Sequence, residues 1–196
     1  LAIDTLSDEH KRKAKAEIEK LIPTIPTPIS ANDVAPIQVG EWTLKINKNG
    51  GIGSLKHGNE EIIKENDEPI FTYRSFCNAD YKYWLTHYSR NLEETAVWAL
   101  GDFARPGMNR VEGKYPAGRF AYFVEKMCAN DSQIIVNLVC DEKLCDKLGA
   151  PRLVQVIYTL TENGLNVDVA WYQKDANRLT EAIYMHIFPV DDIKLK

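Results

Sequence analysis

The chain has 196 residues, of which 44% are hydrophobic and 27% are charged, and its formal net charge at pH 7 is −4. These values are typical of a globular protein, and the length suits one large β domain or two small units. A slightly acidic chain gives no electrostatic basis for nucleic-acid binding, and no apolar run approaches the roughly 20 residues of a membrane span. We therefore expect neither nucleic acid nor a membrane as a partner. Because the sequence begins at Leu1 rather than Met, we expect a fragment of a longer protein.

Four cysteines are present, and their spacing argues against a metal site. Cys140 and Cys145 have four residues between them, and neither Cys77 nor Cys128 completes a zinc-ligand pattern. We interpret all four as small core residues or free thiols. No metal or other cofactor is expected in this chain.

The first segment, residues 1–22, is predicted to contain one helix over residues 7–22. Ser7 is a suitable N-cap, and Asp8 and Glu9 favour the positive end of the helix dipole. The apolar positions form a narrow stripe that needs a partner, either the sheet that follows or helices outside the fragment. The stripe consists of Ala14, Ile18, Leu21 and Ile22.

Four prolines in residues 23–36 predict an extended, semi-rigid linker, and we place the linker at 23–40. Residues 41–196 then form the main domain. Alternating apolar residues and frequent turns predict strands near 42–46, 52–55, 62–63, 71–76 and 95–100. Tyr81, Trp84 and Tyr88 lie at helical spacing, which predicts a short helix with its aromatic side chains in the core, and Asp80 could cap this helix or an ordered loop.

The second half continues the β pattern. Residues 119–127 and 132–140 predict two strands, residues 141–148 a polar crossover, and residues 182–188 a last strand. Between them stands the strongest local signal in the chain. Asn163-Gly164 separates two alternating runs within 152–172, which predicts a long antiparallel hairpin. About ten strands predict a mainly β fold, a large antiparallel β-sandwich preceded by one N-terminal helix.

Three polar clusters could bind a ligand. The segment 171–182 concentrates Lys174, Asn177, Arg178 and Glu181, which can donate and accept hydrogen bonds to a polyol. The alternative, which we favour slightly, is that these charges only tie down a long connection by ion pairing. The other two clusters and one single residue complete the set of candidates, namely Asp80 and Tyr81, Asp102 and Arg105, and Arg152.

Each of these has a structural alternative. Tyr81 suits a sugar-binding lip, because its ring is apolar and its edge is polar, but a core position is favoured. Asp102 and Arg105 could face a ligand or each other. Arg152 stands at a strand start, where an arginine is usually an ion-pair partner. No nucleophile elbow, phosphate loop or metal-binding histidine pattern is present in the sequence, so we name no catalytic residue.

Several of these segments resemble a known family. The similarity is carried by Gly149-Ala150-Pro151-Arg152, the hairpin, the run Trp171 to Ala182 and Phe188-Pro189, together with residues 71–88 and 102–107. They are similar to uncharacterised glycosyl-hydrolase-like proteins that are classed by a domain of unknown function and related to the α-mannosidases of glycoside hydrolase family 38. That pattern favours proline where this chain has Asp175 and Thr180.

The resemblance implies an architecture. Family 38 enzymes have an N-terminal α/β barrel with zinc and a carboxylate nucleophile, then a helical bundle, then a β-sandwich of the galactose-mutarotase-like type. The chain would correspond to the last bundle helix, the linker and this supersandwich. The missing N-terminal barrel and helices of the same protein would be its partners, and zinc would belong to that missing part.

Three functions are compatible with this reading. The first is an accessory β-sandwich of a glycoside hydrolase that supports a carbohydrate site and is not catalytic alone. The second is a free-standing sugar mutarotase or epimerase, for which His186 and Glu181 would be a forced choice of acid–base pair that nothing in their spacing recommends. The third is a carbohydrate-binding module. All three name a carbohydrate as the ligand.

Overall fold

The computed structural model describes residues 2–27, 29–30, 34–88, 90–91, 94, 98, 113–177 and 179–190. Eleven strands lie in this part of the chain. They are β1 (Ile37–Val39), β2 (Trp42–Ile46), β3 (Ile52–His57), β4 (Glu60–Lys64), β5 (Phe71–Ser75), β6 (Gly118–Ala121), β7 (Phe123–Ala129), β8 (Gln133–Val139), β9 (Leu153–Thr161), β10 (Gly164–Tyr172) and β11 (Glu181–Met185). The helices are a 3-10 turn, η1 (Ala2–Thr5), and three α-helices, α1 (Asp8–Glu19), α2 (Asn78–Tyr88) and α4 (Glu142–Leu148).

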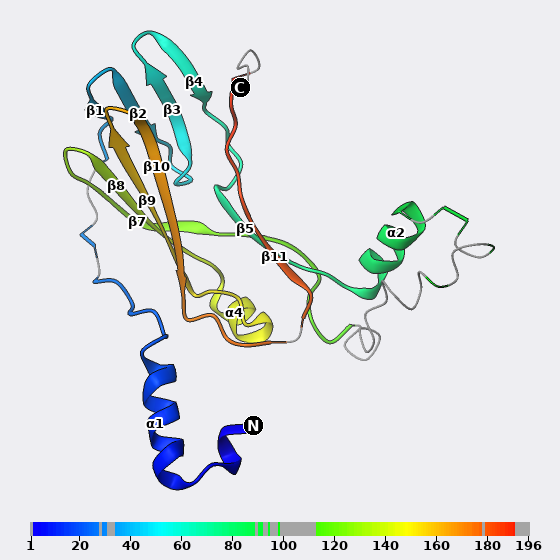
Figure 1. Ribbon diagram of the computed structural model, residues 1–196. Coiled ribbons are helices and arrows are strands. Elements are labelled where there is room, and N and C mark those ends of the chain that lie inside the picture. The colour runs from blue at the N-terminus through cyan, green and yellow to red at the C-terminus, as the bar shows by residue number, and fades with distance from the viewer. Residues whose placement is uncertain are drawn as a thin grey trace.

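The strands form three antiparallel sheets, in the orders β1-β2-β3-β4, β10-β9-β8-β7 and β11-β5-β6. The first and third sheets are joined by the chain that follows β11. There Lys64 N donates to Phe188 O at 3.3 Å, and Val190 N donates to Ile62 O at 3.1 Å. Figure 1 shows this stretch running from β5 up to β4. The described strands therefore form a mainly β, sandwich-like fold, as the sequence predicts.

The β9–β10 hairpin is confirmed, and β9 supplies the centre of the core. Gly164 pairs with Thr161 at the turn, and the register continues to Tyr172 opposite Leu153. Val154, Val156 and Tyr158 of β9 are completely buried. Full burial of a large apolar side chain contributes about 1.5–3 kcal/mol, so this one strand carries a large part of the stability.

The sheets meet at the turn between β2 and β3. Tyr158 donates its hydroxyl proton to Gly50 O at 2.8 Å across the core. Gly50 has a φ of +78°, and a Cβ there would lie 2.9 Å from a methyl carbon of Val136. Only glycine combines this backbone conformation with so close an approach.

The strand predicted over residues 119–127 is wrong in one respect, because it is two strands in different sheets. β6 pairs with β5, whereas β7 pairs with β8. Tyr122 lies between them and is buried, with its hydroxyl donating to Pro151 O at 2.5 Å. Its backbone N–H donates to Phe71 O at 3.1 Å. The chain therefore changes sheets at a residue whose side chain and backbone are both hydrogen-bonded.

The N-terminal helix is confirmed, with Ser7 as its N-cap accepting from His10 N. None of its residues is buried, and Ile18 and the following Leu21 are exposed. Residues 37–39, which the sequence analysis placed in the linker, form β1 and pair with β2. The strand predicted over 95–100 falls almost wholly outside the described residues.

Candidate functional site

The nine candidate residues divide into three groups. Lys174, Asn177 and Glu181 meet in one network beside α4, and Arg152 lies near it. Asp80 and Tyr81 lie together at the start of α2. The remaining three lie outside the described residues, so nothing is said of their structure: Asp102, Arg105 and Arg178.

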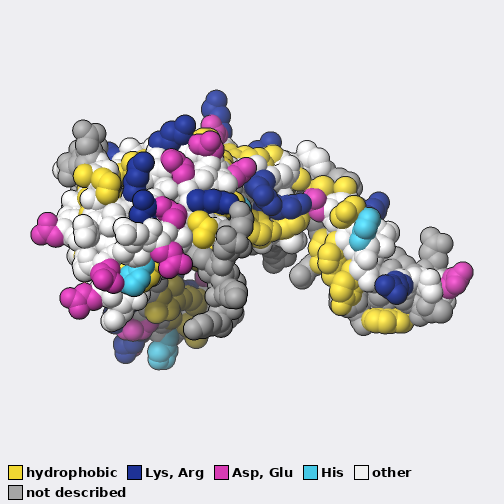
Figure 2. All heavy atoms as spheres, turned by 90° about the horizontal axis from the view of Figure 1, so that it is seen from above, with side chains coloured by type: hydrophobic (Ala, Val, Ile, Leu, Met, Phe, Trp, Pro, Cys, Tyr) yellow, Lys and Arg dark blue, Asp and Glu magenta, His cyan; other side chains and the backbone are white. Residues whose placement is uncertain are grey.

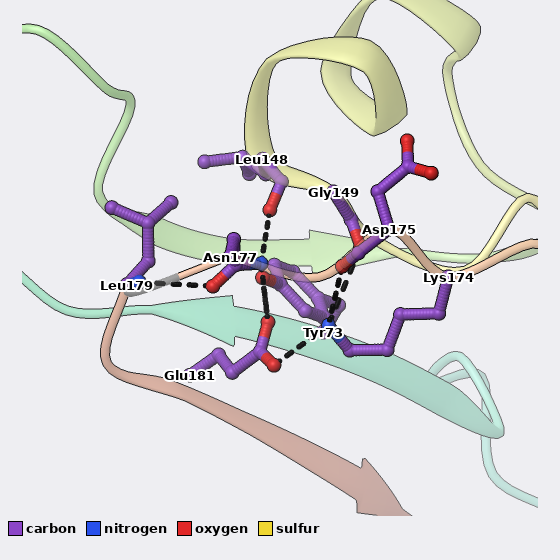
Figure 3. Close-up of polar contacts among 8 residues, drawn as sticks. All are labelled: Tyr73, Leu148, Gly149, Lys174, Asp175, Asn177, Leu179 and Glu181. Carbon is purple, nitrogen blue, oxygen red and sulfur yellow. Dashed lines mark hydrogen bonds and ion pairs between the residues drawn. The ribbon is translucent and has the colours of Figure 1, made fainter. Parts of the chain in front are cut away.

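The network is centred on Glu181, the first residue of β11. Its carboxylate accepts from the hydroxyl of Tyr73 at 2.5 Å and from the side-chain amide of Asn177 at 3.2 Å. The ammonium of Lys174 forms an ion pair with the other carboxylate oxygen at 2.7 Å. Tyr73 reaches Glu181 because antiparallel pairing sets Glu181 opposite Ser75, one side-chain repeat along β5 on the same face. Figure 3 shows the three donors converging on the carboxylate.

The same residues attach the chain before β11 to the end of α4. Asn177 Nδ2 donates to Leu148 O at 2.7 Å, and Lys174 Nζ lies 3.4 Å from Gly149 O. Asn177 Oδ1 accepts from Leu179 N at 2.9 Å, which closes the turn before β11. Gly149 ends α4 in the left-handed conformation, with a φ of +67°. Two side-chain contacts therefore hold the connection at the end of α4, and a third orders the turn before β11 (Figure 3).

Burial and these contacts set the protonation states. Burial alone would raise the pKa of Glu181, but the bonds from Lys174, Tyr73 and Asn177 outweigh it and lower that pKa. Burial and the neighbouring carboxylate raise the pKa of Tyr73 far above its ordinary value. At neutral pH the network thus holds a charged Glu181 and a neutral Tyr73. The interpretation that Lys174 and Glu181 tie down the connection is confirmed.

Arg152 is likewise an ion-pair partner, as expected for an arginine at a strand start. Its guanidinium pairs with the carboxylate of Asp146 on α4. A groove of about 310 Å³ lies nearby, between the end of α4 and residues 175–179. Among the described residues that line it, one is aromatic, namely Tyr115.

The second cluster begins with Asp80 in the first turn of α2. One carboxylate oxygen accepts from Cys77 N at 2.8 Å, and the other accepts from the guanidinium of Arg74 at 3.2 Å. The bond from Cys77, followed by that from Arg74, lowers the pKa of Asp80 despite partial burial. Asp80 therefore stabilises the helix start from its third position, as in a capping box, rather than as the N-cap residue itself.

Aromatic rings surround this Arg74–Asp80 pair. The guanidinium of Arg74 lies 4.5 Å from the ring centroid of Phe76, in cation–π geometry. Tyr81 and Trp84 on α2 have ring centroids 6.0 Å apart. Together with Tyr83 and Thr180 these residues line a groove of about 320 Å³, which we call the α2 groove.

The expectation that the α2 aromatics fill the core is wrong for Trp84 and Tyr88, and Tyr81 is partly exposed as well. Trp84 is 41% exposed and Tyr88 is 64% exposed, and their rings stack on each other at 5.0 Å. Leu85 is the one buried residue of the helix. α2 projects from the sandwich in Figure 1, and Figure 2 shows hydrophobic side chains gathered over its surface.

His186 and Glu181 are on different faces of their sheet. Glu181 bonds to Tyr73, whereas His186 Nε2 lies 3.1 Å from the hydroxyl of Thr72, the neighbour of Tyr73 on β5. Side chains alternate along a strand, and five residues span about 16 Å. The two groups do not converge on one reacting atom.

Comparison with known proteins identifies the family of the chain. Residues 1–167 match the family described as Domain of unknown function (DUF5054). The chain belongs to this DUF5054 family. No curated protein sequence matches it significantly.

The DUF5054 match covers α1, the linker and the α2 groove except for Thr180, and it ends before Lys174, Asn177 and Glu181 of the network. Within the described part of this DUF5054 chain, no group of three or more His, Cys, Asp or Glu side chains is arranged to hold a metal ion. No helix among the described residues is long and apolar enough to cross a membrane. The four cysteines are free thiols, with Cys145 buried.

Sequence reasoning missed three residues of these sites, namely Tyr73, Arg74 and Phe76. All three belong to the segment predicted as a strand over 71–76, where alternation places Arg74 and Phe76 on one face and Tyr73 on the other. That alternation was the available signal. The partner of each residue depends on the pairing of β5 with β11 and on the turn into α2, which the sequence pattern does not encode.

Proposed function

We propose that this DUF5054 domain is an accessory β-sandwich of a carbohydrate-active protein and that its α2 groove contacts the sugar. The observation that carries the proposal is the groove itself. In it, Phe76, Tyr81 and Trp84 surround the ion pair between Arg74 and Asp80.

The chemistry of the groove suits a sugar better than a fully apolar ligand. A pyranose has apolar C–H faces that pack on aromatic rings, and hydroxyl groups around its edge that both donate and accept hydrogen bonds. Phe76, Tyr81 and Trp84 supply rings, the guanidinium of Arg74 supplies donors, and the carboxylate of Asp80 supplies acceptors. A small number of fixed polar groups among apolar walls is the usual composition of a small-molecule site.

The finer part of the proposal is kinship with glycoside hydrolase family 38. In that case a separate catalytic unit, with zinc and a carboxylate nucleophile, would carry out hydrolysis, and this sandwich, of the galactose-mutarotase-like type, would support it. The apolar stripe of α1 would then pack against the neighbouring bundle helices. The exposure of Ile18 on α1, and of Leu21 and Ile22 in the turn after it, supports this role, because apolar side chains on one side of a helix normally lie against another element.

The test is an NMR titration of the ¹⁵N-labelled chain with an α-linked mannobiose. We expect the indole resonance of Trp84 and the amides of α2 to shift. Trp84→Ala and Asp80→Asn should each weaken binding at least fivefold. Trp171→Ala is the matched control, because Trp171 is 46% exposed on β10 and does not line the groove. Unchanged binding in Trp84→Ala, or no shift at α2 with mannobiose or with other disaccharides, would refute the proposal.

A carbohydrate-binding module is the second candidate, and the exposed rings of α2 favour it. The two functions differ in affinity. A wall of a larger site should bind the disaccharide in the millimolar range, whereas an independent module should bind in the micromolar range, which is about 4 kcal/mol tighter. The same titration measures this difference.

The mutarotase or epimerase alternative has less support. Proton exchange at one anomeric carbon needs an acid and a base within hydrogen-bond reach of the same atom. Glu181 is bound to Tyr73, Lys174 and Asn177, and His186 faces the other side of the sheet. An assay for anomerisation of free glucose, galactose and mannose checks this, and catalysis abolished by His186→Ala would favour the alternative.

A further inference from the structure

A row of aromatic residues continues from β11 along the face that carries Arg74. Tyr184 lies opposite Thr72, and Ala182 lies opposite Arg74. Because side chains alternate, Ala182, Tyr184 and His186 share one face with Arg74, whereas Tyr73 and Glu181 point to the other. Phe188 follows two residues after His186 and continues the same alternation.

The rings of this row are regularly spaced and nearly parallel. The centroids of Tyr184 and His186 are 6.4 Å apart with an interplanar angle of 27°, and those of His186 and Phe188 are 6.3 Å apart with an angle of 12°. This spacing is the two-residue repeat of a β-strand. All three residues are partly exposed.

A cation flanks this row, as one flanks the rings of the α2 groove. Arg119 of β6 is exposed, and its guanidinium lies 5.4 Å from the centroid of the Tyr184 ring. Arg119 pairs with Arg74 across β5 and β6, so both guanidinium groups lie on the same face. The face thus repeats the combination of ring and guanidinium that defines the groove.

The row starts where the α2 groove ends. Thr180 lines the groove, and Arg74, opposite Ala182, lines it too. From Thr180 to Phe188 the extended chain covers about 26 Å at roughly 3.3 Å per residue. A single sugar unit in the groove would not reach Phe188, so a chain of several sugar units is needed to contact both the groove and Phe188.

We propose that the ligand is an extended oligosaccharide, which occupies the α2 groove with one end and lies along Tyr184, His186 and Phe188 with the rest. This inference rests on the proposed function of the groove. The rings would pack against successive sugar faces, Arg119 would donate to hydroxyl groups beside Tyr184, and the imidazole of His186 is oriented by its bond to Thr72.

The experiment is an NMR-detected affinity series with α-linked manno-oligosaccharides of one, two, four and six units. We expect the dissociation constant to fall at least tenfold between the two-unit and six-unit ligands. Tyr184→Ala should return the six-unit ligand to the affinity of the two-unit ligand and leave the two-unit affinity unchanged. Arg119→Ala, at an exposed position, should reduce only the long-ligand affinity about threefold and guards against a folding defect in Tyr184→Ala.

The outcomes separate this inference from the proposed function. Two-unit binding that depends on Trp84, with no gain from longer chains or no effect of Tyr184→Ala and Arg119→Ala, would overturn the oligosaccharide row and leave the groove intact. Absence of binding by every ligand in the series would overturn both. If the gain in affinity with ligand length is lost in Trp171→Ala rather than in Tyr184→Ala, the oligosaccharide binds elsewhere on the protein. That result would also overturn the row.

Discussion

The Glu181 network and the α2 groove use similar residue types with opposite results. In the network, the charged groups bond to one another and to the end of α4, and the one aromatic residue, Tyr73, is fully buried. In the groove, the ion pair of Arg74 and Asp80 is surrounded by rings that are partly exposed, Trp84 by 41%. The polar atoms of the network bond to other parts of the chain and hold it in place. The groove instead presents aromatic rings and polar groups to solvent.

The difference shows why a concentration of charge is a weak sign of a binding site. The segment 171–182 has the denser set of polar side chains, yet Lys174, Asn177 and Glu181 bond to one another within the chain. Burial makes this pairing necessary, because a polar group left unpaired inside a protein costs about 1–3 kcal/mol. Exposed rings next to a fixed ion pair are the better indicator here.

The largest expected effect is on the network. Glu181→Ala removes the acceptor of a buried hydroxyl, that of Tyr73, and the partner of Lys174, so we expect a loss of about 3 kcal/mol in unfolding free energy. Urea denaturation measures it. Glu60→Ala, at an exposed position on β4, is the control and should change stability by no more than about 0.5 kcal/mol. A loss below about 1 kcal/mol for Glu181→Ala would contradict a structural role for the network.

A pair of glycine substitutions isolates the attachment of the connection to α4. Gly149 and Gly58 have φ values of +67° and +58°, so alanine strains the backbone similarly at both. A Cβ at Gly149 would lie 3.0 Å from both Asn177 Nδ2 and Asp175 O, whereas nothing lies within 4 Å at Gly58. We expect Gly149→Ala to cost about 2 kcal/mol and Gly58→Ala about 1 kcal/mol. Equal losses in thermal or urea unfolding would show that the contact carries no stability.

On α2, we expect a buried residue and an exposed ring to differ in their contribution to stability. Leu85→Ala should destabilise the chain by roughly 1.5–2 kcal/mol, because Leu85 is the buried residue of α2. Tyr88→Ala on the same helix should cost no more than about 0.5 kcal/mol, because its ring is mostly exposed. Equal costs would mean that the α2 rings are part of the core, as the sequence pattern suggested, and would remove the argument for a binding surface.

The smallest effect is the dependence of stability on pH. The pKa of Glu181 is lowered by folding from an ordinary value of 4.5, and that of Asp80 from 3.8. Folded carboxyl groups with lowered pKa values bind fewer protons than unfolded ones, so their stabilisation is present above these values and is lost as the pH falls towards the folded pKa values. Urea unfolding between about pH 6 and pH 3 should show the loss, with a shallower slope in Glu181→Gln. An unchanged slope in that variant would contradict the assignment.

Local sequence signals predicted the elements, and long-range contacts decided the rest. The hairpin follows from alternation around Asn163-Gly164, and α1 begins after Ser7 because Ser7 is a good cap. The break at Tyr122 had no local signal, since it arises from the hydroxyl bond to Pro151 and from the change of sheet. Likewise the spacing on α2 suggested a core face, but Trp84 and Tyr88 are 41% and 64% exposed.

The candidate residues show the same division between what local sequence signals predict and what long-range contacts decide. The ion-pair interpretations of Arg152 and of Lys174 with Glu181 needed only general preferences of charged residues, and they are confirmed. The partner of Asp80 is Arg74, which the pairing of strands and the turn into α2 bring close. Asp102, Arg105 and Arg178 stay predictions, because they lie outside the described residues.

Hydrogen–deuterium exchange with and without a saturating manno-oligosaccharide of six units tests the central claim most directly, because it compares both regions in one experiment. The account predicts slower exchange in peptides that cover residues 76–88 and 182–188, and unchanged exchange in peptides that cover 145–150 and 173–177. Protection at 145–150 and 173–177 without protection at 76–88 would contradict it, because the ligand would then bind at the Glu181 network instead of the α2 groove.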